Sequence, residues 1–356
     1  MVGACLIGRV KMSLLLSLLA LVWVGRLAVA GTLGGINIVE PASYKAARLV
    51  HDGISQANYT GFYGSTKATC RDVYVPLREG QVKAYRPELF EALRFTAGVS
   101  DVAWAACMDP THLDVLSADS KSGQAFWRST DGLLVLKTIK PYECRNLRSM
   151  LDQLAAHLTA EPSAISSVLG LFRVKVGGRK MYLMACRNAY HADSWHASTC
   201  FDLKGSTVGR SKAPSSIVLK DMDLLSEGRR LRLGQARPLL LRTLQRDAQF
   251  LSHYGLMDYS LLVDVEHVPR GFLGRLLPGF FYHPHHPRER GGKLILIGTD
   301  GNVYHFGIID FLQQYTFRKW LETLLKGFFW DRRKISCVPP RFYASRFLGF
   351  IDENTD

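Results

Sequence analysis

The sequence predicts an α+β fold of two lobes around a shared cleft, with an antiparallel sheet in the N-terminal lobe. A chain of 356 residues is longer than a typical single domain, so it can divide a large core between two bodies. Apolar runs of strand length occur in pairs around short glycine-containing turns, as in β-hairpins. Amphipathic helical patterns lie between these pairs, which is typical of mixed helix and sheet architectures.

The N-terminal half contains a predicted helix, a strand, a second helix and a hairpin. The first helix spans 86–95, since Pro87 is followed by helix-forming residues. The run 133–139 is apolar except for Lys137 and reads as a strand, and a helical pattern of leucine and methionine follows it. Strand-like runs on both sides of Gly177 and Gly178 then predict a hairpin that extends an antiparallel sheet.

The C-terminal half contains one long helix and a second hairpin. Apolar residues at 240, 244, 248 and 251 follow one helical face within 239–254, and Gly255 is placed to cap that helix. The runs 294–298 and 303–309 flank an Asp-Gly turn, and the second run ends on Asp310. Between helix and hairpin, 269–292 is rich in Gly, Pro and His and reads as a loop insertion.

Charge and cysteine content restrict the class of partner and the compartment. The formal net charge of +14 favours an anionic partner such as nucleic acid, an acidic membrane or a phosphorylated substrate. The seven cysteines include no CxxC pair, which indicates neither a zinc site nor a dense disulfide framework and fits a reducing compartment.

The N-terminus resembles a targeting segment. Arg9 and Lys11 precede an apolar run at 12–25, and Ala28-Val29-Ala30 resembles a signal-peptidase site. Three interpretations stay open: a signal peptide, a membrane anchor, or a hydrophobic leader that comes from a misassigned start, since Met12 could also initiate.

Several residues are suited to phosphate transfer from ATP. That chemistry needs a loop over the phosphates, a lysine and metal-binding or base-like aspartates. The chain supplies them in order, as Ser122 with Gly123 in a small-residue loop, Lys137 in a strand, Asp258 after the long helix and Asp310 at a strand end. Each has a simpler reading, because lysine often protects an edge strand and aspartate often forms turns.

Three longer strings resemble the phosphatidylinositol-phosphate kinase family. They are FDLKGSTVGR at 201–210, MDYSLLV at 257–263 and FGIIDFLQ at 306–313, in the order found in that family. Weaker matches extend the resemblance over 81–350. The resemblance implies a two-lobed kinase-like fold with ATP between the lobes, and Mg²⁺ as the metal.

The resemblance also implies residue roles around ATP. Lys137 matches the lysine that holds the ATP phosphates, and Ser122 with Gly123 match the loop over them. Asp258 matches the catalytic aspartate that orients or deprotonates the attacking hydroxyl, and Asp310 matches the metal-binding aspartate.

Further residues match contacts to the nucleotide base and to phosphates. Lys204 and Arg210 are candidates for contacting phosphates of nucleotide or lipid. The adenine-contacting hinge is expected near Asn188, although Cys-Arg-Asn at 186–188 departs from the family's Met-Asn-Asn.

The segment 313–347 matches the part of the family that lies on the membrane and selects the lipid. Its cations Arg332, Arg333 and Lys334, together with Lys326 and Arg341, are interleaved with Phe328, Phe329 and Trp330, so the segment predicts contact with an anionic membrane surface and a phosphoinositide headgroup. Glu322 resembles the glutamate of type I enzymes, which favours the 5-hydroxyl of phosphatidylinositol 4-phosphate as acceptor. Trp320 replaces a family lysine, so a 4-kinase acting on the 5-phosphate isomer is the nearest alternative.

The predicted organisation is a leader at 1–30, an extension at 31–80 and a catalytic domain at 81–350, whose lobes meet near 188 and 189. We expect the protein at the cytosolic face of a membrane, where ATP and phosphoinositides are found, and leave a homodimer open. Two other functions are weighed: a phosphoinositide-binding scaffold with little turnover, and a nucleic-acid binder, for which no known module is recognised.

Overall fold

The computed structural model describes residues 45, 47–53, 72–78, 80–117, 124–189, 198–212, 216–226, 228–267, 294–316 and 337–356. The predicted leader at 1–30 and the predicted loop insertion at 269–292 lie outside these ranges. Within the described ranges, no helix has the length and apolar character needed to span a membrane.

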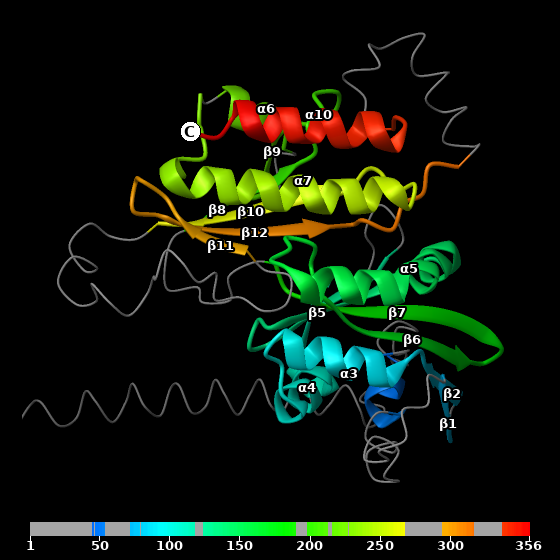
Figure 1. Ribbon diagram of the computed structural model, residues 1–356. Coiled ribbons are helices and arrows are strands. Elements are labelled where there is room, and N and C mark those ends of the chain that lie inside the picture. Colours follow the sequence, from blue (N-terminus) through cyan, green and yellow to red (C-terminus); the bar gives the residue numbers. More distant parts are fainter. Residues whose placement is uncertain are drawn as a thin grey trace, which may run out of the picture.

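The N-terminal lobe is built on a seven-stranded sheet in which every pair of neighbours is antiparallel (Figure 1). Its strands in spatial order are β1 (Val73–Leu77), β2 (Gly80–Ala84), β6 (Val168–Val176), β7 (Arg179–Arg187), β5 (Leu134–Ile139), β4 (Phe126–Ser129) and β3 (Leu113–Ser117). The predicted hairpin around Gly177 and Gly178 is confirmed as β6 and β7. The predicted strand at 133–139 is confirmed as β5.

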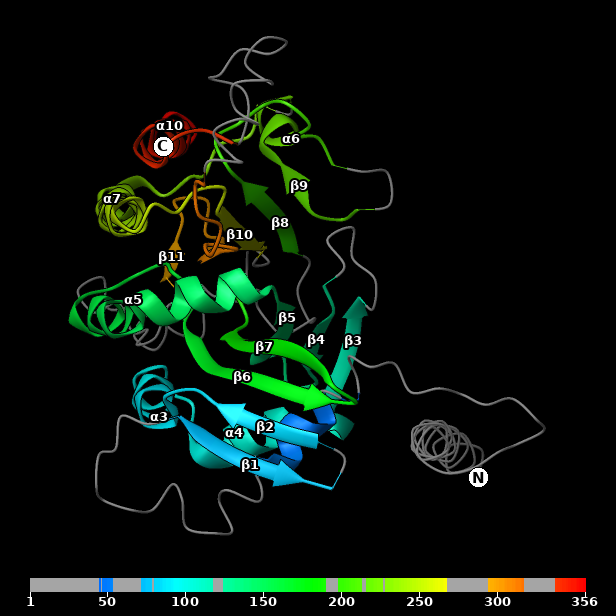
Figure 2. The same ribbon diagram turned by 90° about the vertical axis from the view of Figure 1, so that its right-hand side faces the viewer.

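Helices cover both faces of this sheet (Figure 2). The helices of this lobe are α3 (Pro87–Thr96), α4 (Asp101–Met108) and α5 (Pro141–Ala160), with a short turn of 3₁₀-helix, η1 (Pro110–His112). Leu147 and Leu151 of α5 share a hydrophobic core with Leu171 of β6. On the other face, Trp104 of α4 shares a second core with Leu136 of β5. The predicted helices at 86–95 and beyond 139 are confirmed.

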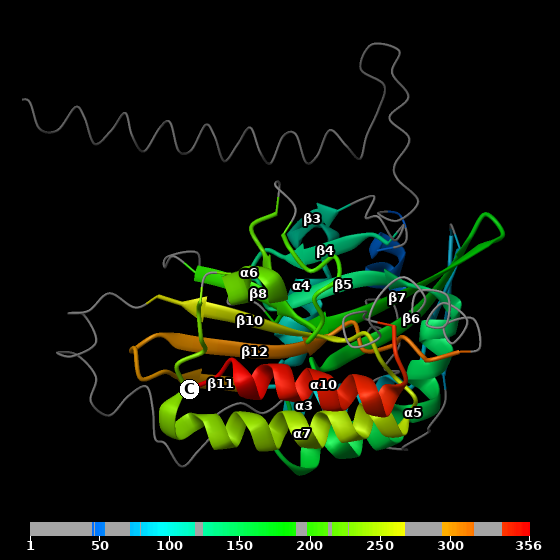
Figure 3. The same ribbon diagram turned by 90° about the horizontal axis from the view of Figure 1, so that it is seen from above.

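The C-terminal lobe is built on a five-stranded sheet with two long helices packed on one face. Its strands in spatial order are β11 (Leu294–Ile297), β12 (Val303–Ile309), β10 (Ser260–Glu266), β8 (Ser198–Leu203) and β9 (Leu219–Lys220). All pairs are antiparallel except β8 with β9. The helices α7 (Arg237–His253) and α10 (Pro340–Glu353) lie side by side (Figure 3), with α6 (Asp221–Ser226) and η2 (Gly234–Ala236) nearby.

The predicted long helix at 239–254 and the hairpin around Asp300 and Gly301 are both confirmed in this lobe. The two-lobed α+β prediction is therefore correct, with an antiparallel sheet in the N-terminal lobe.

The chain passes from one lobe to the other through a linker that is bonded to the second sheet. The linker residue Ile165 forms a bridge with Ile308 of β12, and Ile308 exchanges backbone hydrogen bonds with Ala164 and Ser166. Asp247 of α7 is fully buried and accepts hydrogen bonds from the hydroxyl of Ser163 and the amide of Ala164. These contacts fix where β12, and therefore the residue that follows it, lies against the first lobe.

The domain boundaries at 30, 80, 188 and 350 stay predictions, although two of them cross observed elements. Strand β1 pairs with β2 across residue 80, and the helical residues 47–53 bury Leu49 and Val50 in the core beneath the same sheet. At the other end, α10 continues past residue 350 to Glu353. A cut at 80 would divide a hairpin, so 47–53 and β1 lie within the folded unit of the N-terminal lobe.

Candidate functional site

Lys137 lies in the interior of the first sheet. Its strand, β5, has β7 on one side and β4 on the other, so the lysine does not protect an exposed sheet edge. Leu134 and Leu136 alternate with Lys137 and are completely buried on the opposite face of the strand. The alternation therefore directs the Lys137 side chain, which is 13% exposed, to the face that carries α5.

Asp310 meets Lys137 from the other lobe. Nζ of Lys137 donates a hydrogen bond to Oδ1 of Asp310 at 2.7 Å, across 173 positions of the sequence. Asp310 follows the last residue of β12 and its side chain is 56% exposed. The ion pair therefore joins a strand of the first sheet to the end of a strand in the second.

Asp258 is held by a second lysine, Lys204, from the segment that follows β8. Nζ of Lys204 donates to Oδ1 of Asp258 at 2.8 Å and to its backbone carbonyl oxygen at 2.7 Å. One ammonium group therefore fixes both the main chain and the carboxylate of Asp258, two residues before β10 begins.

The two aspartates share an unusual backbone conformation. Among the described residues, positive φ angles of non-glycine residues occur at Arg86, Asp258 and Asp310, with values of 41°, 62° and 57°. Left-handed backbone costs free energy in residues with a Cβ, although aspartate tolerates it better than most. Such conformations persist where the surrounding contacts impose them, and they are concentrated at functional sites.

Electrostatics couples the two ion pairs. Burial alone would raise the pKa of Asp310, but the charge and hydrogen bond of Lys137 outweigh it and, with the charge of Lys204, hold that pKa below its usual value. Burial likewise opposes the charge on Lys137, yet Asp310 raises the pKa of that ammonium above its usual value. Burial raises the pKa of the nearby Cys186 to about 11, so this thiol stays protonated at neutral pH. The site therefore brings two lysines and two aspartates together.

Helix α10 supports the backbone beside both Asp258 and Lys204. The hydroxyl of Tyr343 donates to the carbonyl oxygen of Tyr259, and the rings of Tyr259 and Tyr343 meet edge to face at 4.7 Å. Gly205 has a φ of 65°, and a Cβ there would lie 2.9 Å from Cα of Phe347. Only glycine lets this loop approach α10 so closely.

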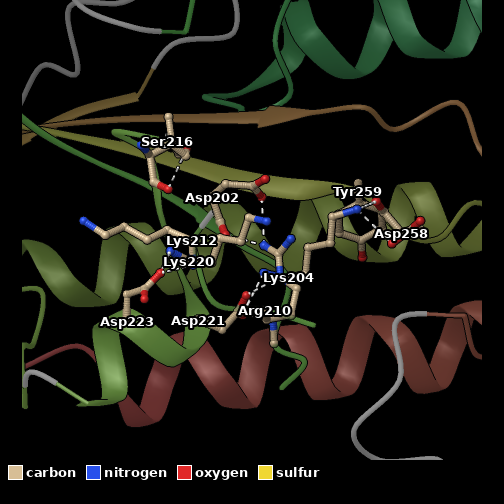
Figure 4. Close-up of polar contacts among 12 residues, drawn as sticks. Asp202, Lys204, Arg210, Lys212, Ser216, Lys220, Asp221, Asp223, Asp258 and Tyr259 are labelled. Atoms are coloured by element: carbon tan, nitrogen blue, oxygen red, sulfur yellow. Dashed lines mark hydrogen bonds and ion pairs between the residues drawn. The ribbon is translucent and has the colours of Figure 1, made fainter. Parts of the chain in front are cut away.

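Arg210 lies within a buried network and not at the surface (Figure 4). Its Nε donates to Oδ2 of Asp221 at 2.7 Å, and its Nη2 donates to Oδ1 of Asp202 at 3.0 Å and to the carbonyl oxygen of Asp202. The contacts of Arg210 are thus structural ones, and its predicted contact with a phosphate stays a prediction.

Asn188 is also buried, at the end of β7. Its side-chain amide donates to the carbonyl oxygen of Gly132 at 2.9 Å, and its main-chain amide donates to the carbonyl oxygen of Leu133 at 2.9 Å. Asn188 therefore stabilises the turn between β4 and β5, and its predicted contact with adenine stays a prediction. The other predicted site residues lie outside the described ranges: Ser122, Gly123, Glu322, Arg332, Arg333 and Lys334.

Two acidic residues near the site were given no role by the sequence. Glu143, in the first turn of α5, adds to the field that raises the pKa of Lys137 and accepts hydrogen bonds from Gln124 at 3.3 Å and the amide of Lys140 at 2.6 Å. Its carboxylate caps the main-chain amide of Lys140 three residues earlier, but lysine at the N-cap position is not part of the capping-box signature, so the sequence carried no such signal. Asp221 is the other, and it organises the segment that carries Lys204.

Asp310 is compatible with a magnesium site completed by substrate phosphates. In the described part of the chain, no three His, Cys, Asp or Glu residues cluster closely enough to hold a metal ion. Mg²⁺ is commonly held by one or two carboxylates together with substrate phosphates, so Asp310 fits that pattern without a protein cage.

Comparisons with known proteins agree with the strings found in the sequence. A family model described as "Phosphatidylinositol-4-phosphate 5-Kinase" matches residues 108–292 and 286–354. "Phosphatidylinositol 4-phosphate 5-kinase 5" of Arabidopsis thaliana is 30% identical over 327 residues, which cover 76% of this chain and 42% of that protein.

Two vertebrate proteins are similar as well. "Phosphatidylinositol 4-phosphate 5-kinase type-1 beta" of Gallus gallus is 26% identical over 316 residues, covering 76% of this chain and 57% of that protein. "Phosphatidylinositol 4-phosphate 5-kinase-like protein 1" of Homo sapiens is 28% identical over 295 residues, covering 75% of this chain and 74% of that protein. The chain spans less than half the length of the plant relative and more of the other two.

Proposed function

The chain belongs to the phosphatidylinositol-4-phosphate 5-kinase family, and from this premise we propose that it is a lipid kinase that transfers the γ-phosphate of ATP to a phosphatidylinositol phosphate. The observation that carries the proposal is the pairing of Lys137 with Asp310 across the two lobes, beside the pair formed by Lys204 and Asp258. Two cations and two carboxylates meet where a kinase needs to neutralise phosphates, hold a metal and orient a hydroxyl.

In the proposed reaction, a hydroxyl oxygen of the inositol ring attacks the γ-phosphorus of ATP. A new phosphorus–oxygen bond forms while the bond to the oxygen bridging the β and γ phosphorus atoms breaks, and ADP leaves with that electron pair. The hydroxyl proton passes to Asp258, whose Oδ1 is bonded to Lys204, which leaves Oδ2 as the acceptor.

The remaining residues act on charge. Lys137 is the cation that would neutralise the ATP phosphates, and its bond to Asp310 places it at the boundary of the two lobes. Asp310 is the residue that would hold Mg²⁺, which supplies charge neutralisation when bound. We expect Ser122 and Gly123 over the phosphates and Asn188 near the base, as the resemblance implies.

The acceptor is proposed to be the 5-hydroxyl of phosphatidylinositol 4-phosphate, which would give the 4,5-bisphosphate. The names of the relatives and Glu322 support this choice. Transfer of labelled phosphate to vesicles that contain either the 4-phosphate or the 5-phosphate lipid tests it, with Asp310→Asn as control. Preference for the 5-phosphate lipid would leave the family assignment unchanged and make phosphatidylinositol 5-phosphate the acceptor instead.

Transfer to neither lipid by a folded protein that binds the vesicles would support a phosphoinositide-binding scaffold instead. The presence of Lys137, Asp258 and Asp310 favours catalysis, since a chain that had lost its activity would not need to keep all three.

We place the reaction at the cytosolic face of an anionic membrane. Arg332, Arg333 and Lys334 are proposed to contact it, and Lys204 and Arg210 keep their proposed contacts with phosphate. Exchange of Arg332 and Arg333 for glutamate should weaken binding to vesicles with anionic lipid and reduce its salt dependence. Equal vesicle binding by this variant and the wild type would contradict the assignment. Light scattering would decide whether the chain forms a homodimer.

A further inference from the structure

Asp221 is a fully buried carboxylate that binds the loop carrying Lys204 (Figure 4). It is the first residue of the short helix α6, at the end of β9. Its Oδ1 accepts hydrogen bonds from the main-chain amides of Lys204 at 2.9 Å and Gly205 at 2.7 Å. Its Oδ2 accepts the bond from Nε of Arg210 at 2.7 Å.

These three bonds close the segment 202–210 on itself. Arg210 reaches from one end of the segment to Asp202 at the other end, and Asp221 holds Arg210 together with the amides near the start. A buried charge of this kind is retained only when its partners satisfy it, so removing it leaves three donors without their acceptor. The carboxylate of Asp221 therefore fixes the main chain at Lys204.

Because its main chain is fixed, Lys204 holds its side chain in the position where it contacts Asp258. The ammonium of Lys204 bonds both the carbonyl oxygen and Oδ1 of Asp258, the residue held at a φ of 62°. Displacing Lys204 would release both bonds at once.

From this chain of contacts we propose that Asp221 is a positioning residue, which sets Asp258 for proton transfer by fixing Lys204. The assignment rests on the proposed kinase function, because it is Asp258 that is expected to receive the hydroxyl proton.

The chain offers a matched control on the same helix. Asp223 accepts hydrogen bonds from two main-chain amides in the same way, those of Lys212 and Lys220, each at 2.8 Å. Neither of these residues contacts Asp258 in the described structure. Asp223→Asn therefore removes a half-buried carboxylate of α6 that also binds two main-chain amides, and it leaves the bonds of Asp221 to the segment 202–210 in place.

The test is a double-mutant cycle in the lipid-phosphorylation assay with the full chain. Asp221→Asn should lower kcat on the order of ten- to hundredfold, the effect of a small misplacement at a reacting centre, and leave the KM for ATP within about twofold. Asp223→Asn should change kcat less than about twofold. Combined with Lys204→Met, Asp221→Asn should add less than about twofold, because its effect passes through Lys204.

A multiplicative loss of kcat in the double variant would overturn the proposal, and so would a kcat for Asp221→Asn equal to that of the wild type. If Asp221→Asn does not fold, Asp221→Glu, which keeps the charge, replaces it in the same measurements of kcat and in the same double variant with Lys204→Met.

Amide hydrogen exchange separates failure of this proposal from failure of the proposed function. In Asp221→Asn, but not in Asp223→Asn, peptides that cover 256–260 should exchange faster, because Asp258 has lost its fixed partner. If the wild type transfers no phosphate to either lipid, the kinase function fails. The coupling of Asp221 to Asp258 is then decided by exchange alone, and unchanged exchange at 256–260 would overturn it.

Discussion

Gly205→Ala should destabilise the protein far more than Gly209→Ala, although both glycines lie in the same loop with nearly the same φ angle. Their φ angles are 65° and 68°. A Cβ on Gly205 would lie 2.9 Å from Cα of Phe347 and 3.1 Å from the carbonyl oxygen of Arg346, both in the main chain of α10. A Cβ on Gly209 would meet no atom within 4 Å.

The magnitudes follow from these two differences. Placing alanine in left-handed backbone costs about 1–2 kcal/mol, partly offset by about 0.4–1 kcal/mol from the stiffer unfolded chain. Gly209→Ala should therefore lower the free energy of unfolding by about 1 kcal/mol. Gly205→Ala carries the same cost plus about 1–3 kcal/mol for forcing a helix backbone away from the loop, and should reach about 2–4 kcal/mol.

Urea unfolding followed by circular dichroism measures both variants. Displacement of α10 should also disturb Lys204 and so reduce phosphate transfer in Gly205→Ala, whereas Gly209→Ala should stay close to the wild type in this assay. Equal destabilisation by the two substitutions would refute the reasoning, since only the contact with Phe347 and Arg346 distinguishes them.

Three further predictions concern the two ion pairs and the helix that supports them. Lys137→Met should lower kcat by about 10²–10³, as the loss of one charge-stabilising donor does, and a kcat within tenfold of the wild type would contradict its role. Because the pKa of Asp310 is lowered in the folded protein, the ionised carboxylate stabilises the fold. This stabilisation is complete above the ordinary pKa of 3.8 and is lost as the pH falls through the lower folded value. The difference in free energy of unfolding between wild type and Lys137→Met should therefore shrink below about pH 4 in acid unfolding. A difference independent of pH would argue against the pair. Tyr343→Phe leaves the carbonyl oxygen of Tyr259 without its donor and should cost about 1–3 kcal/mol in thermal or urea unfolding, with reduced transfer because Asp258 is the adjacent residue; unchanged stability and activity would exclude this support.

Local signals in the sequence were sufficient for the elements that depend on neighbouring residues. The two glycines at 177 and 178 between apolar runs predicted the hairpin of β6 and β7, and the apolar face of 239–254 predicted α7. Both follow from short-range geometry, the turn and the helical period, which need no knowledge of the rest of the chain. The long strings at 201–210, 257–263 and 306–313 likewise identified the family from sequence alone.

The sequence could also name Lys137, Asp258 and Asp310, but it left each with a simpler explanation. Only the strand order showed that Lys137 is not on an edge, because β5 lies between β7 and β4. Strand order depends on how distant segments pair, which propensity and periodicity do not encode.

The amino-acid sequence alone was therefore enough to predict the hairpins and the long helices, and to identify the family and the residue types of the site. The tertiary structure decided which charges meet: Lys137 with Asp310 over 173 residues, and Lys204 with Asp258 over 54. Only the tertiary structure showed that Arg210 is buried and that Asp221 binds it together with the amide of Lys204. The burial and hydrogen bonding of a charged group depend on which partners the fold brings within about 3 Å.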